Sequence, residues 1–341
     1  MSARRYSIVI PVYNRPEELL ELLKSLEVQE SPPWFEVVVI EDGSTKDARQ
    51  IAESFQSKFP VQYHFKENTG PGDSRNFGMS KAEGDYFIIL DSDCILPPKY
   101  LKEIERELTA DYCPLFGGPD RARKDFNSWQ KAVSYSMTSP LSTGGIRGRK
   151  KSVGRFQPRS FNMGISAELF RESGGFGDLH PGEDPDLSLR IFKEGHQSRL
   201  FPEAYVYHKR RIDTKGFLKQ VYLFGLARPL LSQWHPSSAK LVFWLPSMYL
   251  LGGVTAMILV LLGFYGPLYL VIGYGLAVFV HALATTSSLK IALQSVYAVN
   301  AQLIGYGWGF LKSKFLLTFR KESPERLLPE LFRFKKREGA K

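Results

Sequence analysis

Two aspartates separated by one residue, Asp91 and Asp93, follow a continuous apolar run at Tyr86–Leu90. A short run of this kind predicts a buried β-strand, with the two carboxylates just past its end. Like charges this close raise each other's pKa unless a cation neutralises them. A hard divalent ion such as Mg²⁺ or Mn²⁺ does so and keeps coordination positions open for phosphate oxygens. An acidic turn that merely closes the strand is the alternative, and the pair alone does not decide between the two.

A second group of carboxylates, Glu183, Asp184 and Asp186, surrounds Pro185. A proline near a helix start, with acidic side chains in the first turn, predicts a helix N-terminus at this point. Such carboxylates often serve only as partners of the helix dipole, so this group does not by itself establish a site. Arg190 is expected either to pair with one of these acids or to remain a surface charge.

Short apolar runs alternate with helical patterns in the part of the chain that must position these acids. The runs that predict strands are Tyr6–Val12, Phe35–Ile40, Val61–Lys66 and Tyr86–Leu90. Continuous apolar strands joined by short helical crossovers predict an α/β fold with a mostly parallel sheet and helices on both faces. The carboxyl ends of parallel strands meet at one crevice, so the polar residues that follow these strands are expected to lie near Asp91.

The 341-residue chain has a formal net charge of +10. This excess of basic residues favours an anionic partner or a membrane surface. Only two cysteines occur, Cys94 and Cys113, which favours a reducing compartment and predicts no disulfide framework. The first apolar run is too short for a signal peptide. No pattern resembles a nucleic-acid recognition helix or a stacking platform, so no nucleic-acid partner is expected.

Two uncharged apolar stretches, Leu241–Leu262 and Leu268–Leu289, follow the α/β part of the chain. Each is long enough to cross roughly 30 Å of hydrocarbon as a helix, and residues 263–267 between them predict a tight turn. Two buried core helices are the alternative, but they would need a much larger soluble domain around them. Lys240 and Lys290 border the predicted hairpin on the same side, which places that side in the cytoplasm.

The stretch Ile291–Leu317 is more ambiguous, because polar residues interrupt it. We expect a helix that lies along, or dips into, the cytoplasmic interface, since a third span would put the basic C-terminal residues outside. From Phe310 onward the chain carries ten Lys and Arg residues and four Glu residues, a composition that attracts anionic lipids.

Motifs spread over about residues 6–230 resemble family 2 glycosyltransferases with a GT-A fold. They are I-V-I-P-V-Y-N-R, V-V-V-I-E-D-G-S-T, N-T-G-P-G-D-S-R-N-F-G, G-D-Y-F-I-I-L-D-S-D and G-E-D-P-D-L-S-L-R. Each motif is modest alone, and their order carries the signal. The hairpin and G-Y-G-W-G-F are similar to the membrane-attached bacterial members. The resemblance implies a Rossmann-like GT-A catalytic domain at 1–235, a transmembrane helical hairpin at 236–290, and an interfacial helix with a basic cytoplasmic tail at 291–341.

The resemblance also implies an inverting transfer of a sugar from a nucleotide donor, with UDP-sugar as the expected type. The residues that would contact the nucleotide are Pro11, Tyr13, Asn14, Glu41, Asp42, Arg75 and Asp91. Asp42 would accept an imide N–H of the base, and Glu41 replaces the aspartate that is common in the family. Asp93 would hold Mg²⁺ or Mn²⁺ against the diphosphate, with Asp91 beside it. His208 is a second candidate ligand, although a single histidine is more often structural.

Inversion requires a carboxylate on the acceptor side that takes the hydroxyl proton. Asp184 resembles the family's base, Glu183 lies beside it, and Asp186 would then cap or orient the helix. The stretch 139–156 is interpreted as a mobile basic loop, with Arg147, Arg149, Lys150, Lys151 and Arg155. Its part after Gly145 and the segment Lys209–Arg211 are expected to contact the diphosphate or a lipid-linked acceptor. A solvated linker is the alternative for the first of them.

The expected function is therefore transfer of a sugar to a hydroxyl of a lipid, a lipid-linked glycan or a polysaccharide. It would take place at the cytoplasmic face of the inner membrane, by a multi-pass protein. One alternative is a polyprenyl-phosphate sugar synthase, whose acceptor is already an anion and needs no base. Another is a non-catalytic nucleotide-binding membrane scaffold. A processive synthase is disfavoured, because two spans offer little for a channel and the Q-x-x-R-W signature is not evident.

Overall fold

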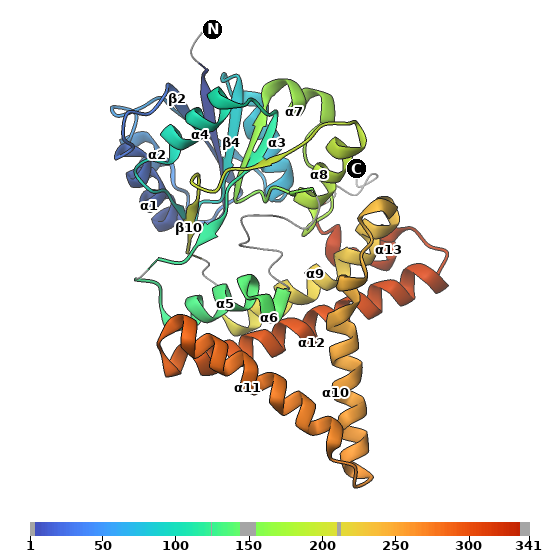
Figure 1. Ribbon diagram of the computed structural model, residues 1–341. Coiled ribbons are helices and arrows are strands. Elements are labelled where there is room, and N and C mark those ends of the chain that lie inside the picture. Colours follow the sequence, from blue (N-terminus) through green and yellow to red (C-terminus); the bar gives the residue numbers. More distant parts are fainter. Residues whose placement is uncertain (1–3, 124, 144–154, 210–212, 335–341) are drawn as a thin grey trace. The chain divides into compact units, whose positions relative to one another are not determined.

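The computed structural model describes residues 4–123, 125–143, 155–209 and 213–334 (Figure 1). The chain separates into two compact units. The first, here called the sheet unit, comprises residues 1–123, 150–210 and 334–341. The second, called the helical unit, comprises residues 124–149 and 211–333.

A seven-stranded sheet forms the centre of the sheet unit. Its order is β3 (Val61–Lys66), β2 (Phe35–Asp42), β1 (Tyr6–Val12), β4 (Tyr86–Leu90), β8 (Asn162–Ser166), β6 (Leu115–Gly117) and β9 (Arg199–Leu200). The first four of these strands run parallel, as predicted, whereas β8 is antiparallel to both β4 and β6. The fold is therefore a GT-A-like mixed α/β domain with a mostly parallel sheet.

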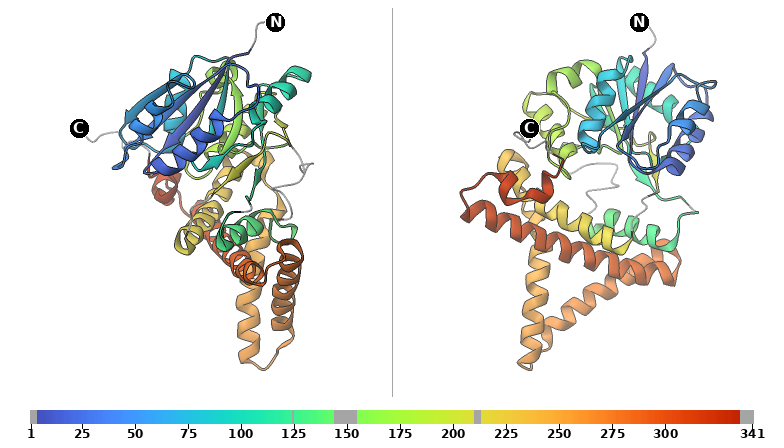
Figure 2. Two further views of the ribbon diagram at one scale, coloured as in Figure 1. Left: turned by 90° about the vertical axis from the view of Figure 1, so that its left-hand side faces the viewer. Right: turned by 180° about the vertical axis from the view of Figure 1, so that it is seen from behind.

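Alternation along the strands divides the core into two layers, one on each face of the sheet. Ile8 and Ile10 of β1 pack in the layer covered by α1 (Pro16–Glu27), α2 (Arg49–Ser54) and α4 (Tyr100–Ala110). Val9, between them, packs in the layer covered by α3 (Pro71–Lys81), α7 (Ala167–Ser173) and α8 (Glu183–Lys193) (Figure 2). These strands are buried on both faces, which explains why their sequence is continuously apolar rather than alternating.

The strand register brings the polar strand ends to one edge of the sheet. Val12 of β1 lies beside Glu41 of β2, and Asp42 lies beside Lys66 of β3. A small second sheet continues from this edge, formed by β5 (Cys94–Ile95), β10 (Val206–His208) and β7 (Asp120–Arg121). Because β5 begins directly after Asp93, this small sheet fixes the segment that follows β4.

The helical unit is built around α12 (Leu289–Phe319), a single helix of 31 residues. It packs against α9 (Thr214–Trp234), α10 (Leu245–Leu261), α11 (Gly266–Thr286) and α5 (Ser128–Thr138) (Figure 2). The remaining elements of the unit are α6 (Pro140–Thr143), η1 (Pro236–Ser238), η2 (Leu241–Trp244), α13 (Pro324–Leu327) and η3 (Pro329–Leu331). Glycines allow α9 and α12 to touch: a Cβ at Gly309 would lie 2.2 Å from the Tyr222 carbonyl oxygen.

Two segments, Leu241–Leu261 and Gly266–Thr286, are long and apolar enough to cross a membrane, with mean hydropathies of 1.7 and 1.8. They coincide with the predicted hairpin, and only 11% of each apolar window is buried. Length and composition alone are a weak indication, because core helices of soluble proteins pass the same test. The predicted interfacial stretch 291–317 falls within α12.

Candidate active site

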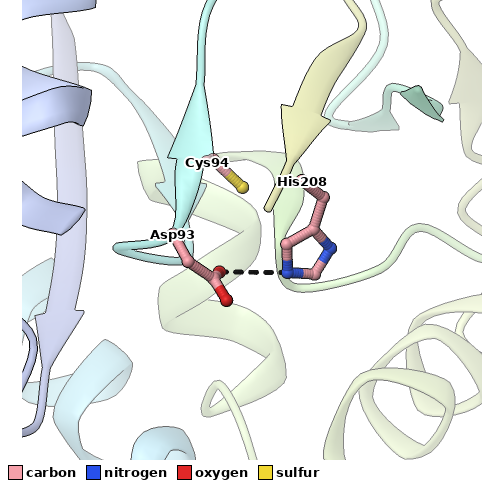
Figure 3. Close-up of side chains that lie close together, drawn as sticks. All are labelled: Asp93, Cys94 and His208. Carbon is pink, nitrogen blue, oxygen red and sulfur yellow. Dashed lines mark ion pairs between the residues drawn. The ribbon is translucent and has the colours of Figure 1, made fainter. Parts of the chain in front are cut away.

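The segment after β4 and the end of β10 bring three donor side chains together. Residues 91–93 turn the chain from β4 into β5, and β10 pairs antiparallel with β5 so that His208 lies opposite Cys94. Donor atoms of Asp93, Cys94 and His208 all lie within 4.8 Å of one another (Figure 3). His208 Nε2 is 3.0 Å from Asp93 Oδ1. The structure thus brings together two of the three predicted metal ligands, Asp93 and His208, and adds a thiol beside them.

Asp93 is a buried anion that two basic side chains hold from different directions. Its side chain is 6% exposed, and Arg15 Nη1 lies 2.6 Å from Oδ2. Burial raises the pKa of the Asp93 carboxyl, but the neighbouring His208 and Arg15 outweigh burial and hold this pKa well below its usual range. A permanently ionised carboxylate beside an imidazole is a donor set that suits a divalent ion such as Mn²⁺. Sequence reasoning missed Arg15, although it follows Asn14 in the first motif.

Asp91, the third predicted ligand, faces a different partner. Arg75 Nη2 lies 2.8 Å from Asp91 Oδ1, and Arg75 Nη1 lies 3.1 Å from Glu183 Oε1. His180 Nδ1 lies 3.0 Å from the same Glu183 oxygen. A chain of charged groups therefore links the end of β4 to the first residue of α8. Arg75 pairs with these two carboxylates and lies over the Phe176 ring, 5.5 Å from its centroid, and its expected contact with the nucleotide stays a prediction.

The acids at the start of α8 differ in their surroundings. The Glu183 side chain is 6% exposed, and burial raises its pKa, but His180 and Arg75 outweigh burial and bring the pKa down to about 2. The Asp184 side chain is 15% exposed, and Arg159 Nη1 lies 3.6 Å from its Oδ2. Asp186 accepts from Arg190 Nε at 3.0 Å, which confirms that Arg190 pairs with one of these acids. Glu183 is thus fixed as an anion in an ion-pair network, whereas Asp184 is more accessible.

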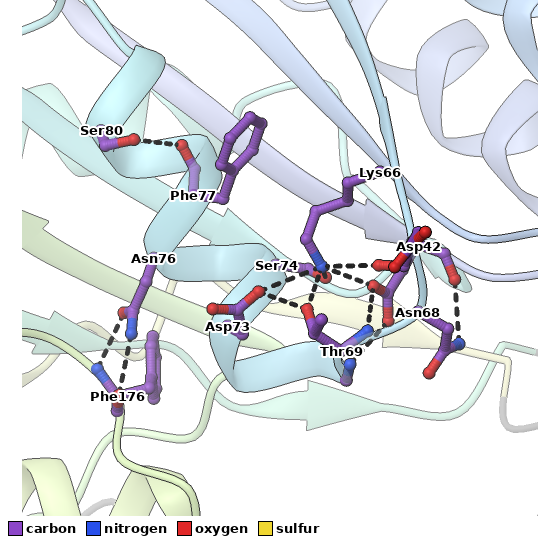
Figure 4. Close-up of polar contacts among 12 residues, drawn as sticks. Asp42, Lys66, Asn68, Thr69, Asp73, Ser74, Asn76, Phe77, Ser80 and Phe176 are labelled. Atoms are coloured by element: carbon purple, nitrogen blue, oxygen red, sulfur yellow. Dashed lines mark hydrogen bonds and ion pairs between the residues drawn. The ribbon is translucent and has the colours of Figure 1, made fainter. Parts of the chain in front are cut away.

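Asp42 anchors the loop that precedes α3 (Figure 4). Its Oδ1 accepts from the Thr69 backbone N–H at 3.0 Å and from Lys66 Nζ at 2.7 Å. Its Oδ2 accepts from the Gly70 backbone N–H at 3.0 Å. These bonds occupy a carboxylate that is 4% exposed. The structure therefore shows Asp42 holding residues 68–70 in place, and direct contact with a base stays a prediction.

The other predicted nucleotide residues lie at the ends of β1 and β2. Glu41 is fully buried and accepts from the Ala48 backbone N–H at 2.8 Å. Asn14 Oδ1 accepts from the backbone N–H groups of Thr45 and Lys46, at 2.9 and 3.1 Å. Pro11 lies within β1, and Tyr13 is 53% exposed just beyond that strand. Tyr13 is therefore accessible to a ligand, whereas Glu41 and Asn14 fix the two loops around it.

Phe334 is a further neighbour of this region that sequence reasoning did not find. A Cβ at Gly70 would lie 2.5 Å from the Phe334 ring, and the ring contacts His180 edge-on with centroids 5.6 Å apart. The sequence pattern holds no signal for this contact, because it joins residues that are far apart in the chain.

Of the basic residues predicted to contact the diphosphate or the acceptor, Lys209 pairs with a carboxylate: its Nζ lies 2.7 Å from Glu21 Oε1. Arg147, Arg149, Lys150, Lys151, Arg210 and Arg211 lie outside the described residues.

The fold and the acidic strand ends define a GT-A-like glycosyltransferase domain. Residues 7–173 match the model of glycosyl transferase family 2, so this part of the chain is a family 2 glycosyltransferase domain. The mannosyltransferase PcManGT from Pyrobaculum calidifontis, solved in complex with GDP-Man and Mn²⁺, has a similar fold. The similarity has a TM-score of 0.63 at 16% sequence identity and covers 92% of this chain and 88% of that one.

Curated relatives are similar over a shorter stretch. The uncharacterized glycosyltransferase YfnE of Bacillus subtilis is 39% identical over 115 residues, which are 32% of this chain and 29% of YfnE. The poly(ribitol-phosphate) beta-N-acetylglucosaminyltransferase TarS of Staphylococcus aureus is 36% identical over 102 residues, which are 29% of this chain and 18% of TarS. The chain thus spans less than a third of either relative.

Proposed function

We propose that the protein transfers a sugar, with inversion, from a nucleoside-diphosphate sugar to a hydroxyl of a lipid, a lipid-linked glycan or a polysaccharide. The observation that carries this proposal is the chain of charged groups in the sheet unit. It links Asp91, at the strand end beside Asp93 and His208, to Glu183 at the start of the helix that carries Asp184. Buried ion pairs thereby link the strand end next to the proposed cation site with the start of the helix that carries the candidate base.

On the donor side, Asp93 and His208 would hold Mg²⁺ or Mn²⁺, with Asp91 beside them. When bound, the ion acts as a Lewis acid that neutralises charge on the departing diphosphate. The complex of PcManGT with GDP-Man and Mn²⁺ supports both the donor type and the metal. Arg15 keeps Asp93 ionised before any cation arrives, because its guanidinium compensates the buried charge. Tyr13 would contact the base or ribose, and Asp42, through residues 68–70, would shape the pocket.

On the acceptor side, Asp184 would accept the proton of the attacking hydroxyl. It is more exposed than Glu183, at 15% against 6% of the side chain, and can therefore meet an acceptor. Glu183, with its low pKa, would remain an anion throughout and position α8 rather than exchange protons. Such proton transfer by a positioned carboxylate contributes about 10²–10⁴-fold to a rate.

We further propose that the acceptor is reached at the cytoplasmic face of the inner membrane. The apolar segments Leu241–Leu261 and Gly266–Thr286 support a helical hairpin in the membrane. TarS, as its name states, transfers N-acetylglucosamine to poly(ribitol-phosphate), which supports a hydroxyl-bearing polymer as one acceptor type. We retain a catalytic domain at 1–235, a hairpin at 236–290 and an interfacial helix with a basic tail at 291–341 as the proposed organisation.

Nucleotide release by the detergent-purified full chain tests the proposal. A panel of UDP-, GDP- and dTDP-sugars is assayed with Mn²⁺ or Mg²⁺, and a total membrane lipid extract serves as acceptor. Asp93→Ala and Asp184→Ala are assayed in parallel. We expect release from one donor class that requires the cation and is lost in both variants.

The other outcomes separate the competing functions. Release that survives in Asp184→Ala would indicate an acceptor that is already an anion, and so a polyprenyl-phosphate sugar synthase. Cation-dependent nucleotide binding without turnover from any donor would indicate a scaffold. A protein that binds none of these nucleotides would refute the assignment of the strand-end crevice as a donor site.

A further inference from the structure

We infer that Cys94 gives the Asp93–His208 site a soft ligand, so that a thiophilic cation such as Zn²⁺ or Cd²⁺ binds there through the thiolate and excludes Mn²⁺ or Mg²⁺. The blockade of transfer that would follow rests on the proposed function. The binding itself does not, because it depends only on the three side chains.

The strand pairing directs Cys94 toward the site. β5 and β10 are antiparallel, with Cys94 directly opposite His208, and side chains of directly opposed residues lie on the same face of a sheet. The sulfur, the imidazole and the Asp93 carboxylate all have donor atoms within 4.8 Å of one another (Figure 3). A cation at the Asp93–His208 pair is therefore within reach of the sulfur after small side-chain movements.

The hydrogen bonding of the Cys94 thiol is weak. Cys94 is fully buried, and its Sγ lies 3.5 Å from the Phe161 carbonyl oxygen, a weak hydrogen bond. When a soft cation binds, a metal–sulfur bond forms, the S–H proton passes to the buffer, and this weak hydrogen bond is given up. Thiolate, imidazole and carboxylate are the ligands that zinc takes in proteins, whereas hard ions prefer oxygen.

A buried cysteine is often only a small apolar residue of the core. The chain supplies a matched comparison, since its second cysteine, Cys113, is also free and buried. Among the residues that the structure describes, Cys113 belongs to no group of metal donors, whereas Cys94 does. The two cysteines are thus alike in burial and differ in the presence of metal ligands nearby.

The test is a titration of the metal-free, detergent-purified full chain with Cd²⁺, followed by the ultraviolet charge-transfer absorbance of the cadmium–thiolate bond. We expect a saturable band in the wild type and in Cys113→Ser, and no band in Cys94→Ser or His208→Ala. Competition against Mn²⁺, followed by the electron paramagnetic resonance of free Mn²⁺, gives a second measure. The preference for Zn²⁺ over Mn²⁺ should fall by more than about tenfold in Cys94→Ser, because even outer partners of a metal ligand change affinity by this factor.

Several results would overturn the inference. They are an absent band in the wild type, a band that persists in Cys94→Ser, a band lost in Cys113→Ser instead, or an unchanged Zn²⁺ preference. If Cys94→Ser fails to fold, Cys94→Ala and the His208→Ala titration decide the matter. A clear cadmium band with no binding of Mn²⁺ or nucleotide would support the soft site and count against the proposed transferase, so the two failures are distinguishable.

Discussion

Arg75 Nη1 lies 3.1 Å from Glu183 Oε1 in the interior of the sheet unit. Both side chains are almost inaccessible, at 5% and 6% exposure, so neither charge can be solvated by water if the other is removed. The same guanidinium reaches Asp91 through Nη2. Arg75 thus pairs with two carboxylates, one just after β4 and one at the start of α8.

Removal of Arg75 should therefore destabilise the protein strongly. Breaking a buried ion pair on one side costs about 3–5 kcal/mol, and we expect a loss of this size in the unfolding free energy of Arg75→Met. Denaturant unfolding in detergent measures it. The control is Arg106→Met, since Arg106 also faces two carboxylates, Glu103 and Glu107, but is 59% exposed. It should change stability by at most about 1 kcal/mol. Similar losses in the two variants would contradict the role assigned to Arg75.

The low pKa of Glu183 predicts a pH-dependent contribution to stability. This pKa is lowered from 4.5 to about 2, so the folded protein binds fewer protons at this site than the unfolded chain does. The stabilisation is therefore complete above about pH 4.5 and is lost as the pH falls toward 2. We expect Glu183→Gln to be less stable than the wild type near neutral pH, with a difference that shrinks across this window.

Denaturant unfolding of wild type and variant at a series of pH values measures that difference. Glu53→Gln is the control, because Glu53 is a surface residue, 47% exposed, that pairs with the exposed Arg49 at 3.6 Å. Its difference from the wild type should be small at every pH. A Glu183→Gln difference that stays constant through the acid range would show that the carboxyl is not held as an anion in the fold.

Substitutions of the two aspartates at the start of α8 should have different effects, one on catalysis and the other on stability. We expect Asp184→Asn to lower turnover by about 10²–10⁴-fold while nucleotide affinity is kept, because an amide cannot accept the hydroxyl proton. Asp186→Asn should keep turnover in the folded fraction and lower the unfolding free energy, since the 3.0 Å bond from Arg190 then ends on a neutral amide oxygen and the ion pair is lost. Donor turnover, nucleotide titration and thermal unfolding of both variants check this. The reverse pattern would move the base to Asp186.

Much of the sheet unit could be predicted from the sequence, because its signals are local. Buried parallel strands are continuously apolar, and the polar residues after them mark the strand ends, so Asp91 and Asp93 were found before the fold was known. The antiparallel direction of β8 could not be predicted, because a short strand carries no local signal for the strand with which it pairs. The two helices of membrane-spanning length could be predicted for the same local reason, because each comes from one continuous uncharged apolar run.

The partners of the site residues could not be predicted in the same way. Arg15, Arg75 and Lys66 all meet carboxylates that are distant in the sequence, and only the packed fold determines which acid each cation meets. The expectation for Asp42 illustrates this. A carboxylate after a strand suggests a ligand contact, yet three donors of the Lys66–Gly70 segment converge on it in the fold. Strand register, which places Lys66 beside Asp42, decides the outcome.

The loop that Asp42 holds should be sensitive to any side chain at Gly70. Gly70 has a φ of +91°, and an added Cβ would lie 2.5 Å from the Phe334 ring. Gly174→Ala is the matched control, since Gly174 has a φ of +69° and its Cβ would meet nothing within 4 Å. We expect Gly174→Ala to cost only backbone strain, about 1–2 kcal/mol. Gly70→Ala should cost more and should also weaken nucleotide binding, because residues 68–70 are displaced.

The double variant Gly70→Ala/Phe334→Ala isolates the steric part of that cost. Removing the ring should restore part of the stability of Gly70→Ala. The loss that remains reflects the backbone of Gly70, whose φ of +91° and ψ of 167° lie in a region that is essentially restricted to glycine, whereas Gly174 is in the αL region. Thermal or denaturant unfolding of the three variants, with nucleotide titration of each, measures both effects. If Gly70→Ala is no worse than Gly174→Ala, Phe334 does not occupy this position in solution.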